Sequence, residues 1–474
     1  MVFFFGCIAL LIVGYVVYGT FVDRVFAPDE NRVTPAVAMR DGIDYMPMPK
    51  WKLIFIQVLD IAGIGPIFGP ILGALYGPAA MVWIVIGCIF AGGVHDYFSG
   101  MLSVRNKGAS IPEVVGEYLG MSARQVMRVF SFVLLMLVGV VFVLSPAKLL
   151  NGLTGIDTGL MVAAIFFYYF LATILPIDKI IGRIYPFLGA LLLSMTVALV
   201  IALLASGHEL LPNLDIMTNT HPGDKPLWPL LFITLSCGAI SGFHSTQSPL
   251  MARCMTNERE GRSVFYGAMI IEGIIGLVWC ALGLSFYNSP EALSAVIAAG
   301  SPSAVVAEVS QSLLGSIGGG LAIAAVIILP ITSGDTAFRS TRLIVAETFK
   351  VNQEGVPKRL MIAIPLFVIG FMISTQNFGT IWRYFGFANQ SLSSLVLWTA
   401  AVYLAQRGKL HWIATVPAVF MTAVCVTFIC NAQIGFGLDY TVSVIAGIVG
   451  AIVAFTIFMV KFVFGDKSVA ETSA

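Results

Sequence analysis

Long apolar segments follow one another along the whole chain, and the short polar connections between them hold most of the charged residues. About thirteen of these segments are long enough to cross the roughly 30 Å of hydrocarbon in a bilayer. The expected spans cover residues 2–21, 52–77, 79–103, 126–147, 159–178, 184–206, 228–251, 264–287, 317–338, 360–376, 380–404, 411–431 and 441–463. The pattern therefore predicts an all-α polytopic membrane protein.

Two of the expected spans contain residues that break a helix. The span at residues 52–77 holds the run Ala62-Gly63-Ile64-Gly65-Pro66. The span at residues 228–251 holds a polar stretch from Ser236 to Met251 that includes Gly238, Gly242 and Pro249. Bare backbone at membrane depth persists only where it is buried in protein or lines a wet cavity. Transporters place their ligands at such discontinuous helices. We therefore expect two broken helices, roughly 180 residues apart, with a substrate bound between them.

Basic residues sort to one side of the predicted membrane. When alternate connections are placed inside the cell, these connections hold all 26 Lys and Arg residues except Lys148, Lys225 and Arg383. Cytoplasmic connections of membrane proteins carry the excess of Lys and Arg. The sorting predicts a multi-pass protein of the cell membrane (plasma or inner membrane), with its N-terminus outside and its C-terminus in the cytoplasm.

The two broken helices open two blocks of five spans. In the predicted topology the first begins inside and the second outside, so the second block is inverted relative to the first. This is the LeuT-like arrangement of the APC superfamily, a 5+5 inverted repeat. Its blocks would cover residues 51–206 and 227–405, with an extra helix at 1–22, two more at 410–464 and a tail at 465–474. Taken singly, each break has an alternative interpretation, because Gly and Pro also serve close packing and kinks.

Composition agrees with this class and narrows the expected partners. A chain that is 58% hydrophobic and only 11% charged does not form a polar soluble surface, and a net charge of +1 gives no indication of nucleic-acid binding. The seven cysteines lie in or beside apolar spans without paired spacing, so we expect no disulfide, no metal centre and no cofactor. The expected partners are the lipid bilayer and a small-molecule substrate, and the sequence does not indicate an oligomeric state.

Ionisable side chains inside membrane spans are costly and so mark candidate functional positions. Asp60, just before the first break, either pairs with a substrate amine, holds a proton, or caps the following half-helix. His244, in the second break, either titrates near neutral pH, donates to a substrate carboxylate, or only packs. Half-helix N-termini after each break favour an anionic or zwitterionic substrate. The candidate substrate-binding residues are Asp60, Ala62, Gly63, Gly65, Ser241, Gly242, His244, Ser245, Thr246 and Gln247.

A second polar segment, Thr332-Ser333-Gly334-Asp335, follows Pro330 in the third span of the second block. In a LeuT-like fold this helix meets the first broken helix, where hydroxyls and freed carbonyls coordinate Na⁺. Thr332, Ser333 and Asp335 are therefore candidates for ion coupling through a bound Na⁺ or a coupling H⁺, and a kinked helix with a polar end is the alternative. The secondary candidates for function are His95, Asp96 and Glu272.

Several stretches together resemble the carbon starvation protein A (CstA) family of peptide transporters. They are residues 61–70 (IAGIGPIFGP), 92–97 (GGVHDY), 106–110 (NKGAS), 238–245 (GAISGFHS) and 331–342. The resemblance implies an APC-superfamily secondary transporter for nutrient scavenging, with peptide uptake in some members and proton-coupled pyruvate uptake in others. Many members are longer and carry paired histidines just ahead of the first break, where this chain has Ile56-Gln57. Substrate and coupling ion therefore do not transfer from the family.

The most concrete hypothesis from the sequence is a secondary active transporter that imports peptides or amino acids by alternating access coupled to H⁺ or Na⁺. A proton-coupled pyruvate or small monocarboxylate transporter is the closest alternative, and a membrane nutrient sensor is an alternative of another class. A passive channel would instead require a continuous polar path. An intramembrane aspartyl protease using Asp60 and Asp335 lacks the Gly-x-Gly-Asp signature, and no His-Glu-x-x-His zinc site occurs, so we expect no enzyme.

Overall fold

The computed structural model describes residues 1–174, 177–208, 210–211, 215–216, 218–376 and 378–465, and all regular secondary structure in this part is helical. The N-terminal span consists of α1 (Val2–Gly14), η1 (Tyr15–Gly19) and α2 (Thr20–Phe26), and it is followed by the short α3 (Pro35–Ala38). The first block contains α4 (Lys50–Ile61), α5 (Gly65–Ala74), α6 (Ala79–Gly87), η2 (Cys88–Gly92), α7 (Gly93–Arg105), α8 (Ile111–Leu119), α9 (Met121–Thr154), α10 (Thr158–Ile174) and α11 (Ile177–Ala205).

The second block begins after a connection of about twenty residues. It contains α12 (Leu227–Thr234), α13 (Gly242–Ala252), η3 (Glu258–Glu260), η4 (Arg262–Tyr266), α14 (Gly267–Phe286), α15 (Pro290–Gly300), α16 (Pro302–Thr348), α17 (Val356–Ser374) and α18 (Phe378–Gln406). The chain then adds α19 (Trp412–Asn431), α20 (Tyr440–Phe458) and η5 (Met459–Val463).

Within the described residues, nine helices are long and apolar enough to cross a membrane, and the bent pair α4 and α5 makes a tenth, with 49° between its halves. The other three expected spans are helical as well. They correspond to α10, which is shorter, to α18, which is more polar, and to the broken pair α12 and α13. The expected set of spans therefore has a helical counterpart throughout the described chain.

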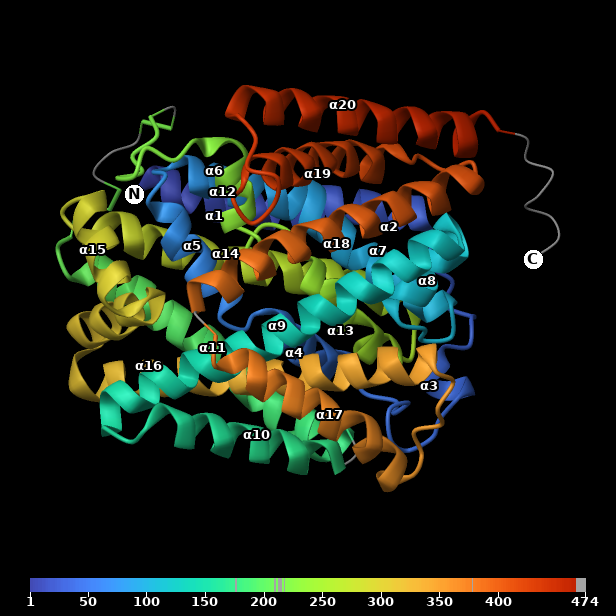
Figure 1. Ribbon diagram of the computed structural model, residues 1–474, viewed down its shortest axis with the longest axis horizontal. Coiled ribbons are helices and arrows are strands. Elements are labelled where there is room, and N and C mark those ends of the chain that lie inside the picture. Colours follow the sequence, from blue (N-terminus) through green and yellow to red (C-terminus); the bar gives the residue numbers. More distant parts are fainter. Residues whose placement is uncertain (175–176, 209, 212–214, 217, 377, 466–474) are drawn as a thin grey trace.

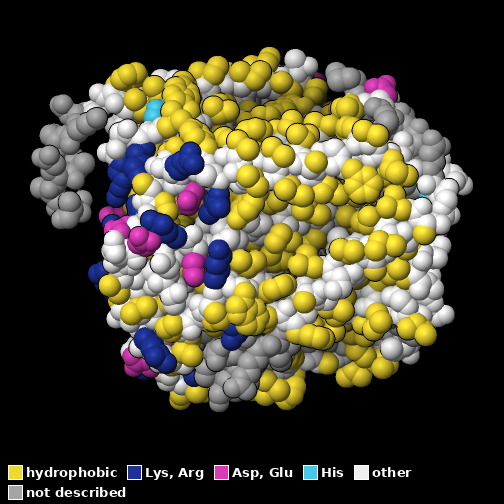
Figure 2. Space-filling view, turned by 180° about the vertical axis from the view of Figure 1, so that it is seen from behind, with side chains coloured by type: hydrophobic (Ala, Val, Ile, Leu, Met, Phe, Trp, Pro, Cys, Tyr) yellow, Lys and Arg dark blue, Asp and Glu magenta, His cyan; other side chains and the backbone are white. Residues whose placement is uncertain are grey.

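The helices run side by side in one bundle, with α19 and α20 along one flank and α10 and α17 along the opposite flank (Figure 1). The chain starts at one end of the bundle, whereas α20 finishes at the other. Lys and Arg side chains gather at a single end, at the left of Figure 2, where Figure 1 places α8. We call this the basic end; Arg124 and Arg128, which pair with Glu113 of α8, belong to it. The wide apolar surface beside it is suited to lipid.

The first break lies where the sequence predicts it. Residues 62–64 leave the helical path between α4 and α5, and Pro66 sits in the first turn of α5, where its missing N–H costs nothing. The glycines of α5 then recur every fourth residue, a spacing that allows helices to approach closely. A Cβ on Gly69 would lie 3.2 Å from the carbonyl oxygens of Thr234 and Cys237, and one on Gly73 would lie 2.9 Å from Leu235 Cδ2. The glycine stripe therefore holds α5 directly against the second break.

The second break is shorter than the sequence indicates. It covers residues 235–241, with Gly238 at φ +89°, and α13 begins at Gly242 and continues through Pro249. The prediction that the stretch from Ser236 to Met251 does not stay helical throughout is confirmed, and its C-terminal part, which includes Pro249, is helical. A proline removes one donor from the helical ladder but does not end a membrane helix whose freed groups are satisfied by its surroundings. Consequently His244 and its polar neighbours lie on a helix rather than on bare backbone.

Candidate functional site

Asn389 of α18 holds the backbone of the second break. Its side-chain Nδ2 donates to the Ser236 carbonyl at 2.8 Å and to Ser241 Oγ at 3.1 Å, and its Oδ1 accepts from the Phe243 N–H at 2.7 Å. The adjacent Gln390 donates to a carbonyl of α12 at 2.8 Å. These bonds satisfy backbone groups that the break leaves without helical partners, which is a requirement at membrane depth. Asn389 is thus a structural anchor of the site that the sequence interpretation missed.

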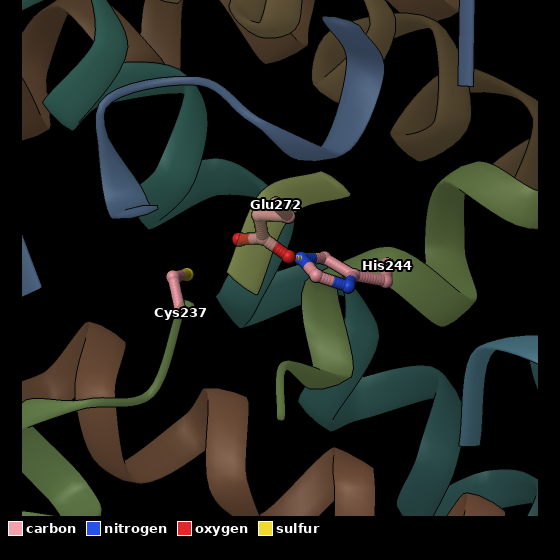
Figure 3. A group of neighbouring side chains, drawn as sticks. All are labelled: Cys237, His244 and Glu272. Atoms are coloured by element: carbon pink, nitrogen blue, oxygen red, sulfur yellow. Dashed lines mark ion pairs between the residues drawn. The ribbon is translucent and has the colours of Figure 1, made fainter. Parts of the chain in front are cut away.

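His244 lies between two carboxylates on other helices. Its Nδ1 is 2.8 Å from Asp96 Oδ2 on α7, and its Nε2 is 3.2 Å from Glu272 Oε2 on α14. The second Asp96 oxygen is 2.7 Å from His95 Nδ1, and the second Glu272 oxygen accepts from the Gly238 N–H at 3.1 Å. All four side chains are fully buried. Figure 3 shows the His244 ring facing the Glu272 carboxylate, with the Cys237 thiol beside them.

This cluster changes the interpretation of His244. Buried carboxylates are stable only when they are paired, and an imidazolium ring donates through both nitrogens. With each ring nitrogen directed at a carboxylate, His244 joins α13 to α7 and α14. The secondary candidates Asp96 and Glu272 are its direct partners, a grouping that their positions in the sequence did not indicate. A direct contact between His244 and substrate stays a prediction.

The remaining polar residues of α13 mostly bond to their own helix. Ser245 Oγ donates to the Gly242 carbonyl at 2.7 Å, and Thr246 Oγ1 donates to the Phe243 carbonyl at 2.6 Å. Gln247 Nε2 donates to Thr246 Oγ1 at 2.9 Å, whereas its buried Oε1 has no hydrogen-bond partner. Hydroxyls bonded to the preceding turn stay within their helix. Of these side chains, Gln247 has the acceptor that is left for another group.

The first break presents a different environment. Asp60 and Gln57, one turn apart on α4, are fully buried, and none of their side-chain oxygen and nitrogen atoms has a hydrogen-bond partner. Ala62 and Gly63 follow at the break, and a Cβ on Gly63 would lie 3.1 Å from Ser333 Oγ of α16. An ionised carboxylate without partners is costly in such a place. Asp60 is therefore the side chain at this break that most needs a proton or a cation.

The predicted ion-coupling segment faces this break. Ser333 Oγ donates to the Leu59 carbonyl at 3.0 Å and to the Leu329 carbonyl at 3.2 Å, and Thr332 Oγ1 donates to the latter at 2.7 Å. The expectation that this helix meets the first broken helix is thereby confirmed. Asp335 is 2% exposed and lies within electrostatic range of Asp60. The segment brings hydroxyl and carbonyl oxygens together near two carboxylates, and its role in ion coupling stays a prediction.

A cavity of about 690 Å³ opens at the end of the bundle opposite the basic end. Its wall is formed by the end of α5, by α12, α15 and α18, and by the chain after α19. Tyr76 follows the end of α5 and Thr234 ends α12, and His221, Lys225 and Arg383 give the cavity a basic character. Two of the three basic residues that fall outside the predicted cytoplasmic connections therefore lie on this cavity.

The basic end is closed by a buried ion cluster. Asp44, in the segment before α4, lies 3.6 Å from Arg339 Nη1 and 3.7 Å from Arg342 Nη2, both on α16. Burial alone would raise the pKa of the Asp44 carboxyl, but the surrounding arginines, Arg342 foremost, hold its pKa below the usual range. Arg253 at the end of α13 joins this region through Glu347, at 2.7 Å. The cluster ties the entry of the first broken helix to α16.

Asn389 and the His244 cluster were missed for different reasons. An Asn-Gln pair in an otherwise apolar span is an available signal, because polar amides in membrane helices are retained to satisfy other groups. The pairing of His244 with Asp96 and Glu272 spans three helices, and no local spacing in one sequence reveals it.

The fold belongs to a known class of transporters. Among solved structures, the chain resembles a manganese transporter from Eremococcus coleocola, with a TM-score of 0.53 at 13% identity over 90% of this chain and 98% of the other. It also resembles a Na⁺-coupled sialic acid symporter, with a TM-score of 0.53 at 15% identity over 96% of each chain. These likenesses, together with two helices that are broken at buried polar positions, show a LeuT-like fold.

The sequence comparisons place the chain more narrowly. The carbon starvation protein CstA profile matches residues 1–155, 146–291 and 289–428, so the chain belongs to the CstA family. An uncharacterized membrane protein of Haemophilus influenzae is 49% identical over 63% of this chain and 95% of its own length. A peptide transporter CstA of Escherichia coli is 24% identical over 90% of this chain and 81% of its own. The pyruvate/proton symporter BtsT of Escherichia coli is 26% identical over 57% and 47%. The named relatives are transporters.

Proposed function

We propose that this protein is a secondary active transporter that imports peptides or amino acids by alternating access, with H⁺ or Na⁺ as the coupling ion. The observation that carries the proposal is the Asp60 carboxylate, which is fully buried at the first break and has no hydrogen-bond partner. A group in that condition suits an ion that arrives and leaves during each cycle. Relatives named as peptide transporters support the substrate class.

The substrate would lie between the two breaks. Both α5 and α13 start there, and the positive ends of helix dipoles attract a carboxylate. If Asp335 rather than Asp60 carries the ion, the ionised Asp60 offers a counter-charge for an amine, and the pair of breaks then fits a molecule with one carboxylate and one amino group. This is the chemistry that peptides and amino acids share.

The coupling ion would bind where α4 meets α16. Protonation of Asp60 removes the cost of an unpaired buried charge, and so would Na⁺ bound to Asp60 together with nearby oxygens. Ser333, Thr332 and the Leu59 carbonyl supply such oxygens, and Asp335 adds a second carboxylate nearby. Loading the ion and substrate together would favour rocking of the broken helices against the rest of the bundle.

We place the basic end in the cytoplasm, in keeping with the distribution of Lys and Arg. The 690 Å³ cavity is then an external vestibule, and Lys225 and Arg383 on its wall attract a substrate carboxylate. The Asp44 cluster is then a cytoplasmic closure that must open for release. The same orientation places the N-terminus outside.

A pyruvate or small monocarboxylate substrate is the second candidate, favoured by the likeness to BtsT and by the basic vestibule. Uptake by purified protein in liposomes distinguishes the two. Labelled pyruvate, single amino acids, dipeptides and tripeptides would be offered under an H⁺ gradient, a Na⁺ gradient, or neither. We expect saturable uptake of a peptide or amino acid that one gradient accelerates. If no gradient changed the uptake of any of these substrates, in tight vesicles that contain folded protein, coupled transport would be refuted.

A further inference from the structure

Three buried side chains around the second break present a set of metal-ligand atoms. Cys237 Sγ from the break, His244 Nε2 from α13 and Glu272 Oε2 from α14 all lie within 4.8 Å of one another. In Figure 3 the thiol and the carboxylate face the same side of the imidazole ring. None of the three side chains is more than 4% exposed.

We propose that Cys237, His244 and Glu272 bind one divalent transition-metal ion of the zinc type. Thiolate, imidazole and carboxylate together are a donor set that Zn²⁺ accepts and that Mg²⁺ or Ca²⁺ does not favour. Bonds of about 2.0–2.1 Å in a tetrahedral site place neighbouring nitrogen and oxygen ligands about 3.3 Å apart. The observed Nε2 to Oε2 distance is 3.2 Å. Two of the ligand atoms are therefore already spaced as the edge of a tetrahedron.

The outer partners orient these two ligands as metal sites require. Ligating histidines direct their second nitrogen to a carboxylate, which fixes the ring and its tautomer. Here Asp96 Oδ2 accepts from His244 Nδ1 at 2.8 Å, and His95 holds the other oxygen, Asp96 Oδ1, at 2.7 Å. His244 Nε2 is therefore left for an ion. The Gly238 N–H donates a hydrogen bond to Glu272 Oε1 at 3.1 Å, so the other oxygen, Oε2, is left for the same ion.

A separate observation points to the same place. His244 Nε2 and Glu272 Oε2 are fully buried, and the contact that joins them is a 3.2 Å ion pair rather than a well-aligned hydrogen bond. Buried polar atoms in proteins are almost always well hydrogen-bonded, so an ion between these two atoms would complete their interactions. The Cys237 thiol lies on the carboxylate's side of the imidazole ring (Figure 3), and its Sγ is within 4.8 Å of both atoms.

The charges balance when the ion binds. Without metal, the carboxylates of Asp96 and Glu272 and an imidazolium at His244 leave one net negative charge, with Cys237 as a thiol. Binding of M²⁺ releases one proton from His244 Nε2 and one from the thiol to solvent, and the His244 Nδ1–H stays on Asp96. The net charge of the buried cluster is unchanged. The ion would fix the second break to α14, a role separate from the proposed coupling site at Asp60.

Cobalt binding to the purified full-length protein in detergent, after treatment with a chelator, tests the proposal. We expect one Co²⁺ per chain by equilibrium dialysis, together with the intense near-ultraviolet absorption of a cobalt–thiolate bond. Cys237→Ser should abolish that absorption and weaken binding at least 10-fold. Cys280→Ser, a buried cysteine further along α14, is the matched control and should leave both unchanged. Asp96→Asn should weaken binding about 10- to 100-fold.

Glu272→Gln, which is nearly isosteric, provides a second ligand variant should Cys237→Ser fold poorly, and gel filtration reports on folding. Zn²⁺ should also raise the melting temperature of the unmodified protein, a readout that needs no variant. The proposal is overturned if the unmodified protein binds no stoichiometric Co²⁺ at 0.1 mM or so. It is equally overturned if Co²⁺ binds without thiolate absorption, or if folded Cys237→Ser binds it as tightly as the unmodified protein.

Discussion

The two helix breaks are built in opposite ways. At the second break, side chains from α7, α14 and α18 bond to the backbone or to His244, so most polar groups there have partners within the protein. At the first break, Asp60 and Gln57 are equally buried but have no hydrogen-bond partner. The contrast indicates a different role for each of the two breaks. The second break is held in a fixed shape, whereas the first retains polar groups for something that binds and leaves.

The greatest loss of stability is expected from His244→Ala. Removing the ring leaves the Asp96 and Glu272 carboxylates buried near each other without their cation, and deleting one partner of a buried pair costs about 3–5 kcal/mol. We expect a lower melting temperature in detergent and uptake reduced at least 100-fold. His411→Ala, outside the cluster, should change neither. Unaltered stability of His244→Ala would show that the second break is not the fixed one.

A smaller loss is expected from Asn389→Ala. The Ser236 carbonyl and the Phe243 N–H would lose their partner, and a buried group left without a hydrogen bond costs about 1–3 kcal/mol. Melting temperature and uptake should fall together. The matched control is Asn151→Ala, because Asn151 donates to the exposed Ile156 carbonyl just after α9. An Asn389→Ala protein as stable as this control would contradict the anchoring role.

The sequence predicts the first break better than the second, for physical reasons. Gly63, Gly65 and Pro66 disrupt a helix by local backbone chemistry, so the break at residues 62–64 is visible without a structure. The contact of Ser333 with the Leu59 carbonyl follows once the LeuT-like topology is recognised. The position at which the second break ends cannot be predicted in this way, because the surrounding helices allow α13 to continue through Pro249. Asn389 acts on residues about 150 positions away, and that pairing depends on tertiary structure alone.

Asp60→Asn should separate function from stability. The carboxylate makes no hydrogen bond that the amide could lose, so the free energy of unfolding should change by less than about 1 kcal/mol. Gradient-driven uptake should nevertheless fall at least 10-fold, because the amide cannot carry a proton or neutralise Na⁺. Asp335→Asn should reduce gradient-driven uptake likewise.

Uptake under H⁺, Na⁺ and no gradient, with melting temperatures of the same preparations, measures both effects. Glu117→Gln, an exposed carboxylate on α8, is the control. If Asp60→Asn lost as much stability as His244→Ala, the two breaks would not differ in the way described. Normal coupled uptake in Asp60→Asn would show that the coupling ion does not bind at Asp60.

The smallest effect is the pH dependence of the stability that Asp44 contributes where it ties the entry of the first broken helix to α16. Arginines hold the pKa of this carboxyl below the usual range, so its folded-state pKa lies below its unfolded-state value. Its contribution to stability is then fully present above the unfolded pKa, about 4, and is lost only as the pH falls through the lower folded value. The difference in melting temperature between the unmodified protein and Asp44→Asn should therefore stay constant between about pH 8 and pH 5. A difference that shrinks across that range would mean that folded Asp44 already binds a proton above pH 5, against the lowered pKa. Asp44 would then join the carboxylate at the first break as a candidate proton carrier.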